Sequence, residues 1–341
     1  MQSDTGSERS FLHSIRHLVQ KPAGARLGFD DDASDIPLTS DTSAVINVDT
    51  FVRKTDWLPG MTAAQVGYKT AVMAVSDIVA KGATPRGLML SLCFPEEYSR
   101  EEAGETVRGF SQYGLKNGIP FLGGDLGCAE DVILTGVAIG TASPHRIVPR
   151  SGTKEGDIIA TTGLFGYTAI AYEHLIRGLE LDTSLRSVVL AAAYKPKIHH
   201  HFVSALAESE AISASMDSSD GLGITLHTMA NQSSLTFVLD DLPISTQVWK
   251  FAREHNFDEM QLLMRGGEEF TLVITIPPEK WDLASDIARQ QSVPLREIGF
   301  AKKGEGVVYE SSEGFVDVPN AGYDSLRGWD EFKNSNRGEH G

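Results

Sequence analysis

Cysteine and long apolar runs are both scarce in this sequence of 341 residues. Its two cysteines, Cys93 and Cys128, do not form a Cys-x-x-Cys pair, so no disulfide framework and no cysteine-based zinc or redox motif is expected. The histidine run at 199–201 is interpreted as a surface run, because adjacent helical residues point in different directions. No apolar run approaches the ~20 residues of a membrane span, and the polar N-terminus lacks the apolar core of a signal peptide. We expect a cytoplasmic protein, which also suits the isolated cysteines.

Basic residues are few as well: 30 Lys and Arg against 46 Asp and Glu give a formal net charge of −16. Binding to nucleic acid without sequence preference, or to an anionic membrane, requires a basic surface, so neither partner is expected. A phosphorylated substrate is compatible with this charge where divalent cations stand between phosphates and acidic groups. The sequence also lacks a P-loop pattern, a protein-kinase catalytic loop and a Gly-x-Ser-x-Gly elbow.

The length is natural for two domains. Strands and helices mix in both halves without strict βαβ alternation, which predicts two α+β domains. The loop at 143–156 is rich in Pro, Gly and basic residues and is the expected boundary, which gives domains 1–149 and 150–330 and a mobile tail 331–341. Residues 1–8 are expected to be disordered. The clearest predicted helices are 11–18, 62–81, 99–117, 198–208, 246–254 and 281–291, and the clearest strands are 43–48, 87–94, 119–122, 132–142, 212–216, 235–239 and 270–276.

Residues 28–35 hold the densest charge, with four aspartates in six positions. Like charges at such spacing raise one another's cost of ionisation. The run is therefore either a solvated turn, where Asp is common, or a site for a hard cation such as Mg²⁺ or Ca²⁺, which prefers oxygen ligands. The run alone leaves both interpretations open.

Other aspartates favour the metal interpretation, because Asp49, Asp125 and Asp217 each follow a predicted apolar strand, where a sheet positions functional loops. Asp77 lies about one turn from the end of the 62–81 helix, where a cation would offset its unfavourable place in the helix dipole. Asp220 precedes a glycine and could equally cap the next helix. We predict that six aspartates converge on one cleft as metal ligands: Asp32, Asp49, Asp77, Asp125, Asp217 and Asp220.

Eight short motifs occur in a fixed order, and together they resemble one family. They are Asp31-Asp32-Ala33, Val48-Asp49-Thr50, Ala74-Val75-Ser76-Asp77-Ile78, Gly82-Ala83-x-Pro85, Gly123-Gly124-Asp125, Arg150-Ser151-Gly152-x-x-x-Gly156-Asp157, Asp217-x-Ser219-Asp220-Gly221-Leu222 and Gly266-Gly267-Glu268-Glu269. This order resembles the thiamine-monophosphate kinase family. That family belongs to the superfamily of aminoimidazole ribonucleotide synthetase, selenophosphate synthetase and a hydrogenase-maturation protein. The resemblance covers roughly residues 25–325, and its last two motifs are similar to the kinase branch.

The resemblance implies an aminoimidazole ribonucleotide synthetase-like fold. An N-terminal ATP- and Mg²⁺-binding domain would pair its sheet with that of a second subunit, and a C-terminal α/β domain would lie beside it. It also implies a homodimer that transfers a phosphoryl group from ATP to thiamine monophosphate. Several Mg²⁺ ions would bind the six aspartates, and no residue would act as an acid or base, since positioning and charge neutralisation suffice. The further implied contacts are Gly124, Arg150 and Ser219 for ATP, and Asp56, Glu268 and Asn320 for the substrate.

The sequence departs from the family pattern at four places. Asp30 stands where the family has Gly, Asn47-Val48 replaces a pair that ends in Thr, Asp56 replaces a histidine, and Asn320-Ala321 replaces an aromatic position. The departures near the substrate leave two alternatives open. One is an ATP-dependent kinase or ligase that acts on another small acceptor, and the other is a non-catalytic nucleotide- and Mg²⁺-binding dimer.

Overall fold

The computed structural model describes residues 7–326. The expected mobile tail, 331–341, and most of the expected disordered N-terminus lie outside the described residues. For the last two residues of that N-terminal stretch the expectation of disorder is wrong. Ser7 caps the first helix by accepting a hydrogen bond from the Ser10 amide, and Glu8 is the first residue of that helix.

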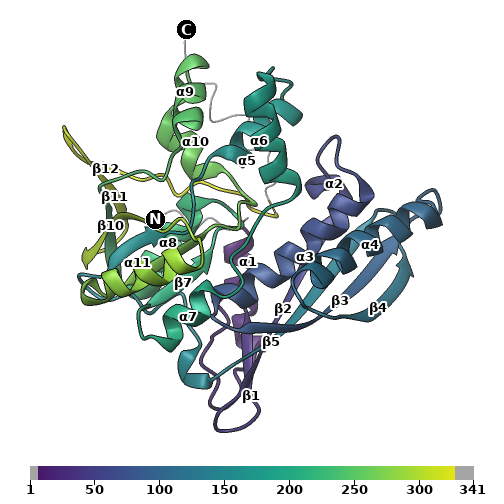
Figure 1. The fold of residues 1–341 in the computed structure, drawn as a ribbon, viewed down its shortest axis with the longest axis horizontal. Helices are drawn as coiled ribbons and strands as arrows, with labels where there is room; N and C mark the ends of the chain where they lie inside the picture. The colour runs from purple at the N-terminus through teal and green to yellow at the C-terminus, as the bar shows by residue number, and fades with distance from the viewer. Residues whose placement is uncertain (1–6, 327–341) are drawn as a thin grey trace.

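The first half of the chain builds a five-stranded sheet in the order β1-β2-β5-β3-β4. Its strands are β1 (Ser34–Pro37), β2 (Ser43–Val52), β3 (Thr84–Phe94), β4 (Phe121–Cys128) and β5 (Ile133–Ala142), and its helices are α1 (Glu8–Ile15), α2 (Arg53–Asp56), α3 (Ala63–Ala80) and α4 (Arg100–Lys116). Figure 1 shows α3 and α4 side by side along one face of this sheet.

Helices α3 and α4 form where the sequence predicts them. Each begins with a capping box, in which Thr62 pairs with Gln65 and Ser99 with Glu102, so that two terminal amide groups find partners. Gly82 follows α3 with φ of 73°, a left-handed conformation that favours glycine at a helix end.

Two glycines allow α3 and α4 to approach closely. A Cβ atom on Gly67 of α3 would lie 1.9 Å from the Thr106 carbonyl oxygen, and one on Gly109 of α4 would lie 1.9 Å from that of Ala64. No side chain fits at such distances, so this contact between the helices depends on glycine at both positions.

No element of the described residues 7–326 covers the opposite face of the five-stranded sheet, which is largely apolar. Val48 of β2, Val137 of β5 and Met89 of β3 are register neighbours across it, and Val48 is 62% exposed. Leu122 and Ile36 are further exposed apolar side chains of these strands. A surface of this kind on a sheet is typical of an interface with another molecule.

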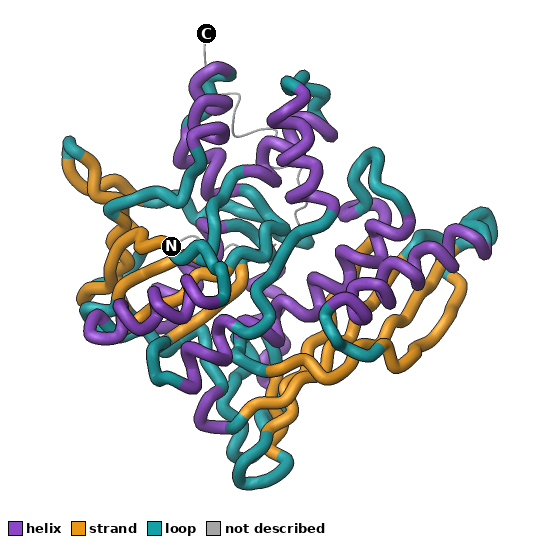
Figure 2. Tube along the Cα trace, in the orientation of Figure 1, coloured by secondary structure: helices purple, strands orange, loops and turns teal. Residues whose placement is uncertain are grey.

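The second half builds a seven-stranded sheet in the order β12-β11-β8-β10-β6-β9-β7. Figure 2 shows strands of this half in orange among its purple helices. Its strands are β6 (Ile158–Thr161), β7 (Ala214–Asp217), β8 (Leu235–Leu239), β9 (Leu272–Ile276), β10 (Arg296–Lys303), β11 (Val307–Ser311) and β12 (Gly314–Asp317), and its helices are α5 (Tyr167–Leu175), α6 (Thr183–Tyr194), α7 (Phe202–Glu208), α8 (Leu222–Ser233), α9 (Thr246–Glu254), α10 (Glu259–Arg265) and α11 (Trp281–Gln290).

Helices cover the centre of this second sheet on both faces. In β9, Val273 packs in a core with α8, whereas the neighbouring Leu272 and Ile274 pack in another core with α7 and α11. This is why β7, β8 and β9 are buried throughout, and why β8 and β9 are apolar except for one threonine each. A third core joins α3 to α5, α6 and α9 and so connects the two halves. Within the described chain, no helix combines the length and the apolar character that a membrane crossing needs.

Several boundaries differ from the sequence prediction. Strands β2 and β4 run further than predicted, so Asp49 and Asp125 lie within strands rather than after them. Asp49 and Thr50 in β2, and the glycines and Asp125 in β4, hid the continuation of these strands. Helix α7 begins at Phe202, four residues later than predicted, which leaves the histidine run 199–201 in the preceding turn. The short elements β1, α2 and β12 were not predicted.

Candidate active site

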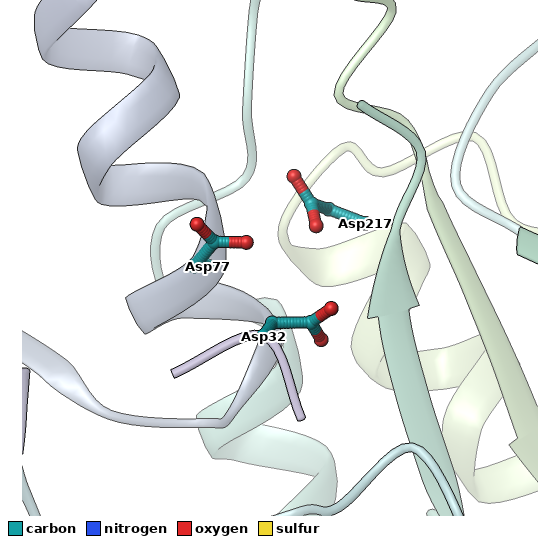
Figure 3. Close-up of side chains that lie close together, drawn as sticks. All are labelled: Asp32, Asp77 and Asp217. Atoms are coloured by element: carbon teal, nitrogen blue, oxygen red, sulfur yellow. The ribbon is translucent and has the colours of Figure 1, made fainter. Parts of the chain in front are cut away.

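Three carboxylates gather at the junction of the two halves. Asp32 comes from the loop before β1, Asp77 from the last turn of α3, and Asp217 from the end of β7. One carboxylate oxygen from each lies within 4.8 Å of the other two, and Figure 3 shows the three side chains approaching one another. We call these three residues the carboxylate cluster.

Two cations flank one edge of the cluster. The Lys81 ammonium, fully buried, lies 2.5 Å from Asp32 Oδ2 and 2.7 Å from Asp31 Oδ1. It also donates to the Ser215 carbonyl at 2.7 Å, and Arg150 pairs with the other oxygen of Asp32. Burial alone would raise the pKa of Asp32, but Arg150 and Lys81 outweigh it and hold that pKa below its ordinary value.

The other two carboxylates of the cluster have neutral partners. Ser76 Oγ donates to Asp217 Oδ2 at 2.6 Å, and Asn47 Nδ2 donates to Asp77 Oδ2 at 2.5 Å. Burial and the neighbouring carboxylates raise the pKa of Asp77 well above its ordinary value, and burial and Asp32 raise that of Asp217. The cluster therefore concentrates negative charge that a hard cation would neutralise.

Asp49 and Asp220 lie at the sides of the cluster. Burial, followed by repulsion from Asp217, raises the pKa of Asp49 to about 7. Burial, followed by repulsion from Glu8 and Asp217, raises that of Asp220 to about 7. Five of the six predicted ligands thus lie at one place. Their donors are all oxygens, the ligand type that Mg²⁺ uses.

Gly124 and Asp125 do not join this group within one chain. Asp125 is exposed on β4, and its register neighbours across the sheet are Ser91, Thr135 and Thr50. Thr50 and Asp49 are adjacent in a strand and point to opposite faces. Asp125 therefore lies on the uncovered face, whereas the side chain of Asp49 turns towards the cluster.

Two cavities meet at the carboxylate cluster. The first has a volume of about 520 Å³ and the second about 580 Å³. Both are lined by Asp32, Asp77, Ser219, Asp220, Glu8 and Tyr323. The cluster therefore stands between two spaces that each have room for a small molecule.

Four basic side chains line the first cavity, together with seven carboxylates. Arg150 comes from the loop between the halves, and Arg9, His13 and Arg16 come from α1 or directly after it. Arg9 donates to Thr228 Oγ1 of α8 at 2.7 Å. Arg16 pairs with Asp30 at 2.8 Å, which gives a structural role to the departure from the family pattern at position 30. Helix α1 is thus a wall of the first cavity, although the sequence indicated only an amphipathic helix.

The second cavity is acidic. Among the described residues, its lining contains seven carboxylate side chains and no lysine, arginine or histidine. Asp49, Asp56 and Glu268 belong to it. Asp56 accepts a hydrogen bond from the Val52 amide at 2.6 Å, while burial, with a contribution from Glu268, raises the pKa of Asp56. Such a cavity favours a ligand with a cationic part.

The Gly-Gly-Glu-Glu motif forms the loop between α10 and β9 at the edge of the second cavity. Glu268 has φ of 61° and Phe270 has φ of 52°, both uncommon for residues other than glycine. Glu269 is buried and accepts hydrogen bonds from the amides of Gly166 and Thr168. The buried carboxylate thus fixes the loop against the start of α5.

Sequence reasoning missed several residues of the site. Asn320 is exposed and does not line either cavity, whereas Tyr323, three residues later, lines both. Lys69 and Lys81 are fully buried behind the site. Lys69 shares the apolar face of α3 with Val66 and Met73, and a charged residue in such a stripe was the available signal.

Comparisons with known proteins identify relatives of this chain. The family model of AIR synthase related protein, N-terminal domain, matches residues 30–142. The thiamine-monophosphate kinase of Nitrosopumilus maritimus is 31% identical over 83% of this chain and 89% of its own length. That of Pyrococcus horikoshii is 29% identical over 93% and 96%, respectively.

Solved structures show the same fold. The protein tt0281 from Thermus thermophilus superposes with a TM-score of 0.80 at 29% identity, covering 91% of this chain and 97% of its own. AaThiL complexed with AMPPCP and TMP superposes with a TM-score of 0.81 at 22% identity, covering 95% and 99%. The fold and the acidic site define an AIR synthase-related protein. Within that class, the match to the Nitrosopumilus maritimus relative shows that the chain belongs to the thiamine-monophosphate kinase family.

Proposed function

We propose that this chain transfers the γ-phosphoryl group of ATP to thiamine monophosphate and so produces thiamine diphosphate. One observation carries the proposal: a cavity that holds arginine side chains and an acidic cavity without lining cations among the described residues meet at a cluster of carboxylates. The curated relatives carry the name of this activity, and AaThiL, which shares the fold, is complexed with AMPPCP and TMP.

ATP would occupy the first cavity, with its phosphates at the cluster. Arg150 would bind phosphate oxygens through its guanidinium group, and Ser219 would contribute a hydroxyl or amide donor. The five gathered aspartates fit Mg²⁺, as oxygen donors with unfavourable mutual repulsion. Bound there, Mg²⁺ would neutralise the phosphate charge that otherwise opposes the approach of a second anion.

The acceptor would occupy the second cavity. Its phosphate is already anionic at neutral pH, so it needs positioning more than a general base. Its thiazolium ring is a cation and matches the carboxylates of Asp56 and Glu268 in charge. Asn320, which stands where the resemblance implies a substrate contact, does not line the cavity, and we propose that Tyr323 supplies that contact instead.

We also propose that the uncovered face of the five-stranded sheet pairs with a second copy of this chain. The row formed by Val48, Val137 and Met89 supports an apolar interface. Asp125 lies on the same face, so in a dimer Gly124 and Asp125 would serve the site of the partner subunit. The proposed domains are 1–149 and 150–330, and the isolated cysteines support a cytoplasmic location.

The test is an acceptor panel with purified protein, ATP and Mg²⁺, followed by chromatography of the products. We expect thiamine diphosphate to form from thiamine monophosphate and to be lost on chelation of Mg²⁺. The Asp217→Asn variant should lose turnover, and the exposed Asp240→Asn variant should keep it. Transfer to another acceptor but not to thiamine monophosphate would favour the broader superfamily alternative, and tight ATP binding without any transfer would favour the non-catalytic one.

A further inference from the structure

A lysine without solvent contact stands behind the acidic cavity. Lys69, in the middle of α3, is 0% exposed, and its ammonium lies 2.6 Å from Glu268 Oε1. Tyr172 of α5 donates its hydroxyl to Glu268 Oε2 at 2.6 Å and to the Gly267 carbonyl at 3.1 Å. Both carboxylate oxygens of Glu268 are therefore held by groups inside the protein.

Folding alone does not require this ion pair. An ammonium group loses its hydration when it is buried, and a well-packed apolar side chain of similar volume often serves stability as well or better. Lys69 lies among the apolar residues of α3, where Val66 is completely buried and Met73 is nearly so. The charge of Lys69 therefore indicates a function that an apolar side chain could not perform.

Glu268 is also held through its backbone. Its φ of 61° places it in the left-handed region, which is unfavourable for residues other than glycine. The Glu268 amide donates to the Ser219 carbonyl, and the Phe270 amide donates to that of Ser218. With its backbone and side chain fixed, Glu268 keeps 20% of its side chain exposed in the lining of the second cavity.

The negative charges that surround Glu268 explain why the Lys69 ammonium beside it matters. Seven carboxylates line this cavity, and among the described residues no lysine, arginine or histidine lines it, so the carboxylates repel one another. The buried Lys69 ammonium, 2.6 Å from Glu268 Oε1, places one positive charge beside these carboxylates. Burial beside Glu268 raises the pKa of Tyr172 well above its ordinary value, so Tyr172 remains a neutral hydrogen-bond donor.

We infer that Lys69 and Tyr172 are positioning residues that hold Glu268 as an oriented anion, which recognises the positive charge of the acceptor. The inference rests on the proposed function for the identity of the acceptor cavity. It adds an orientation to that proposal: the acceptor would bind with its cationic ring against Glu268 and its phosphate at the carboxylate cluster.

The decisive probe is a neutral isostere of thiamine monophosphate, the 3-deaza compound, in which carbon replaces the positive thiazolium nitrogen. Binding of both compounds is measured by calorimetry and their phosphorylation by steady-state kinetics. For the wild-type protein we expect about tenfold or greater preference for the cationic compound. The Lys69→Met variant, which replaces the ammonium with an apolar chain of similar length, should lose most of this preference.

Further variants separate positioning from folding. In Lys69→Met the KM for thiamine monophosphate should rise about tenfold or more, while the KM for ATP stays within about twofold. Glu268→Gln should reproduce this pattern, and the double variant should be no worse than Glu268→Gln alone, because the two residues act as a unit. Tyr172→Phe should show a smaller change in the same direction, and the exposed Lys116→Met should show none.

Each outcome decides the inference. If Lys69→Met and Tyr172→Phe fold but keep the wild-type preference for the cationic compound, the inference is wrong and Lys69 is structural. If the wild-type protein binds the cationic compound preferentially without phosphorylating it, the proposed function fails while the inference stands on the binding data. If wild-type protein binds ATP but neither acceptor compound, both fail. If Lys69→Met does not fold, Glu268→Gln and Tyr172→Phe decide.

Discussion

Replacing Asp49 with Asn should stabilise the metal-free protein while it abolishes turnover. Asp49 lies between Asp217, Asp56 and Glu268, and its pKa in the folded chain is raised from an ordinary 3.8 to about 7. Its ionised form is therefore destabilised by folding. Asn keeps the side-chain oxygen that accepts the Thr50 amide hydrogen bond, at 2.8 Å in this structure, and removes the charge.

The magnitude follows from this pKa. A rise from 3.8 to about 7 corresponds to about 4 kcal/mol of unfavourable ionisation at neutral pH. Most of this unfavourable energy arises from burial of the carboxylate. The amide of Asn is buried at the same place and also loses hydration, so the net gain in the free energy of unfolding at pH 8 should be about 1–2 kcal/mol. Below about pH 4 the Asp49 carboxyl group is protonated in both the folded and the unfolded protein, so the stability gain from removing its charge disappears. This gain should grow between about pH 4 and pH 7 and stay constant above about pH 7.

Urea unfolding in the presence of a chelator, at several pH values from 5 to 8, measures this difference between wild type and Asp49→Asn. Asp240→Asn, an exposed aspartate of the second half, is the matched control and should change stability little at any pH. Excess Mg²⁺ should raise the stability of the wild type more than that of Asp49→Asn, because the ion binds the folded state. A loss of stability in Asp49→Asn at pH 8, or a difference that does not vary with pH, would refute the electrostatic reasoning.

Three further changes test other parts of the structure. Arg9→Ala should raise the KM for ATP by about fivefold or more in steady-state assays and leave the KM for the acceptor unchanged. The reason is that the Arg9 guanidinium group lines only the first cavity. An unchanged KM for ATP would mean that ATP binds elsewhere. Gly67→Ala should lower the free energy of unfolding by about 3 kcal/mol or more, since its Cβ would meet the Thr106 carbonyl at 1.9 Å; a neutral effect in urea unfolding would mean that α3 and α4 separate easily. Mixing equal amounts of inactive Asp125→Asn and Asp217→Asn subunits should restore roughly a quarter of wild-type activity, because about half of the dimers would be hybrids and each hybrid would contain one intact site of two. No recovery after subunit exchange would show that Asp125 acts within its own chain.

Much of the fold follows from local sequence. Helices α3 and α4 carry their own capping residues, Thr62 and Ser99, and the buried strands β8 and β9 are short runs that are apolar except for one threonine each. Such signals depend on neighbouring residues only, so they are visible without the structure. The ends of β2 and β4 were misjudged because their polar residues belong to the site or to the uncovered face, where pairing across the sheet outweighs local preference.

The candidate site was likewise predictable from the sequence only in part. The aspartates were recognisable because each occupies a motif of the family, and five of them gather in one chain. Lys69, Tyr172 and the wall formed by α1 were not recognisable, since each acts on a residue far away in the sequence. The contact of Lys69 with Glu268 joins positions about two hundred residues apart, and only the packing of α3 against the second half brings them together. Asp30 likewise gained a role only when its partner Arg16 was located.

One backbone segment connects the two cavities. The carbonyls of Ser218 and Ser219 accept the amides of Phe270 and Glu268, and the Asp220 carbonyl accepts the amide of Tyr323 at 2.8 Å. The residues proposed for ATP, metal and acceptor therefore share a single hydrogen-bonded unit at the end of β7. Because phosphoryl transfer depends on the distance between donor and acceptor, a unit held by backbone bonds sets that distance more tightly than long side chains would. This explains why Glu268 keeps an unfavourable left-handed φ: the turn directs its amide to Ser219 and its carboxylate to Lys69 at the same time.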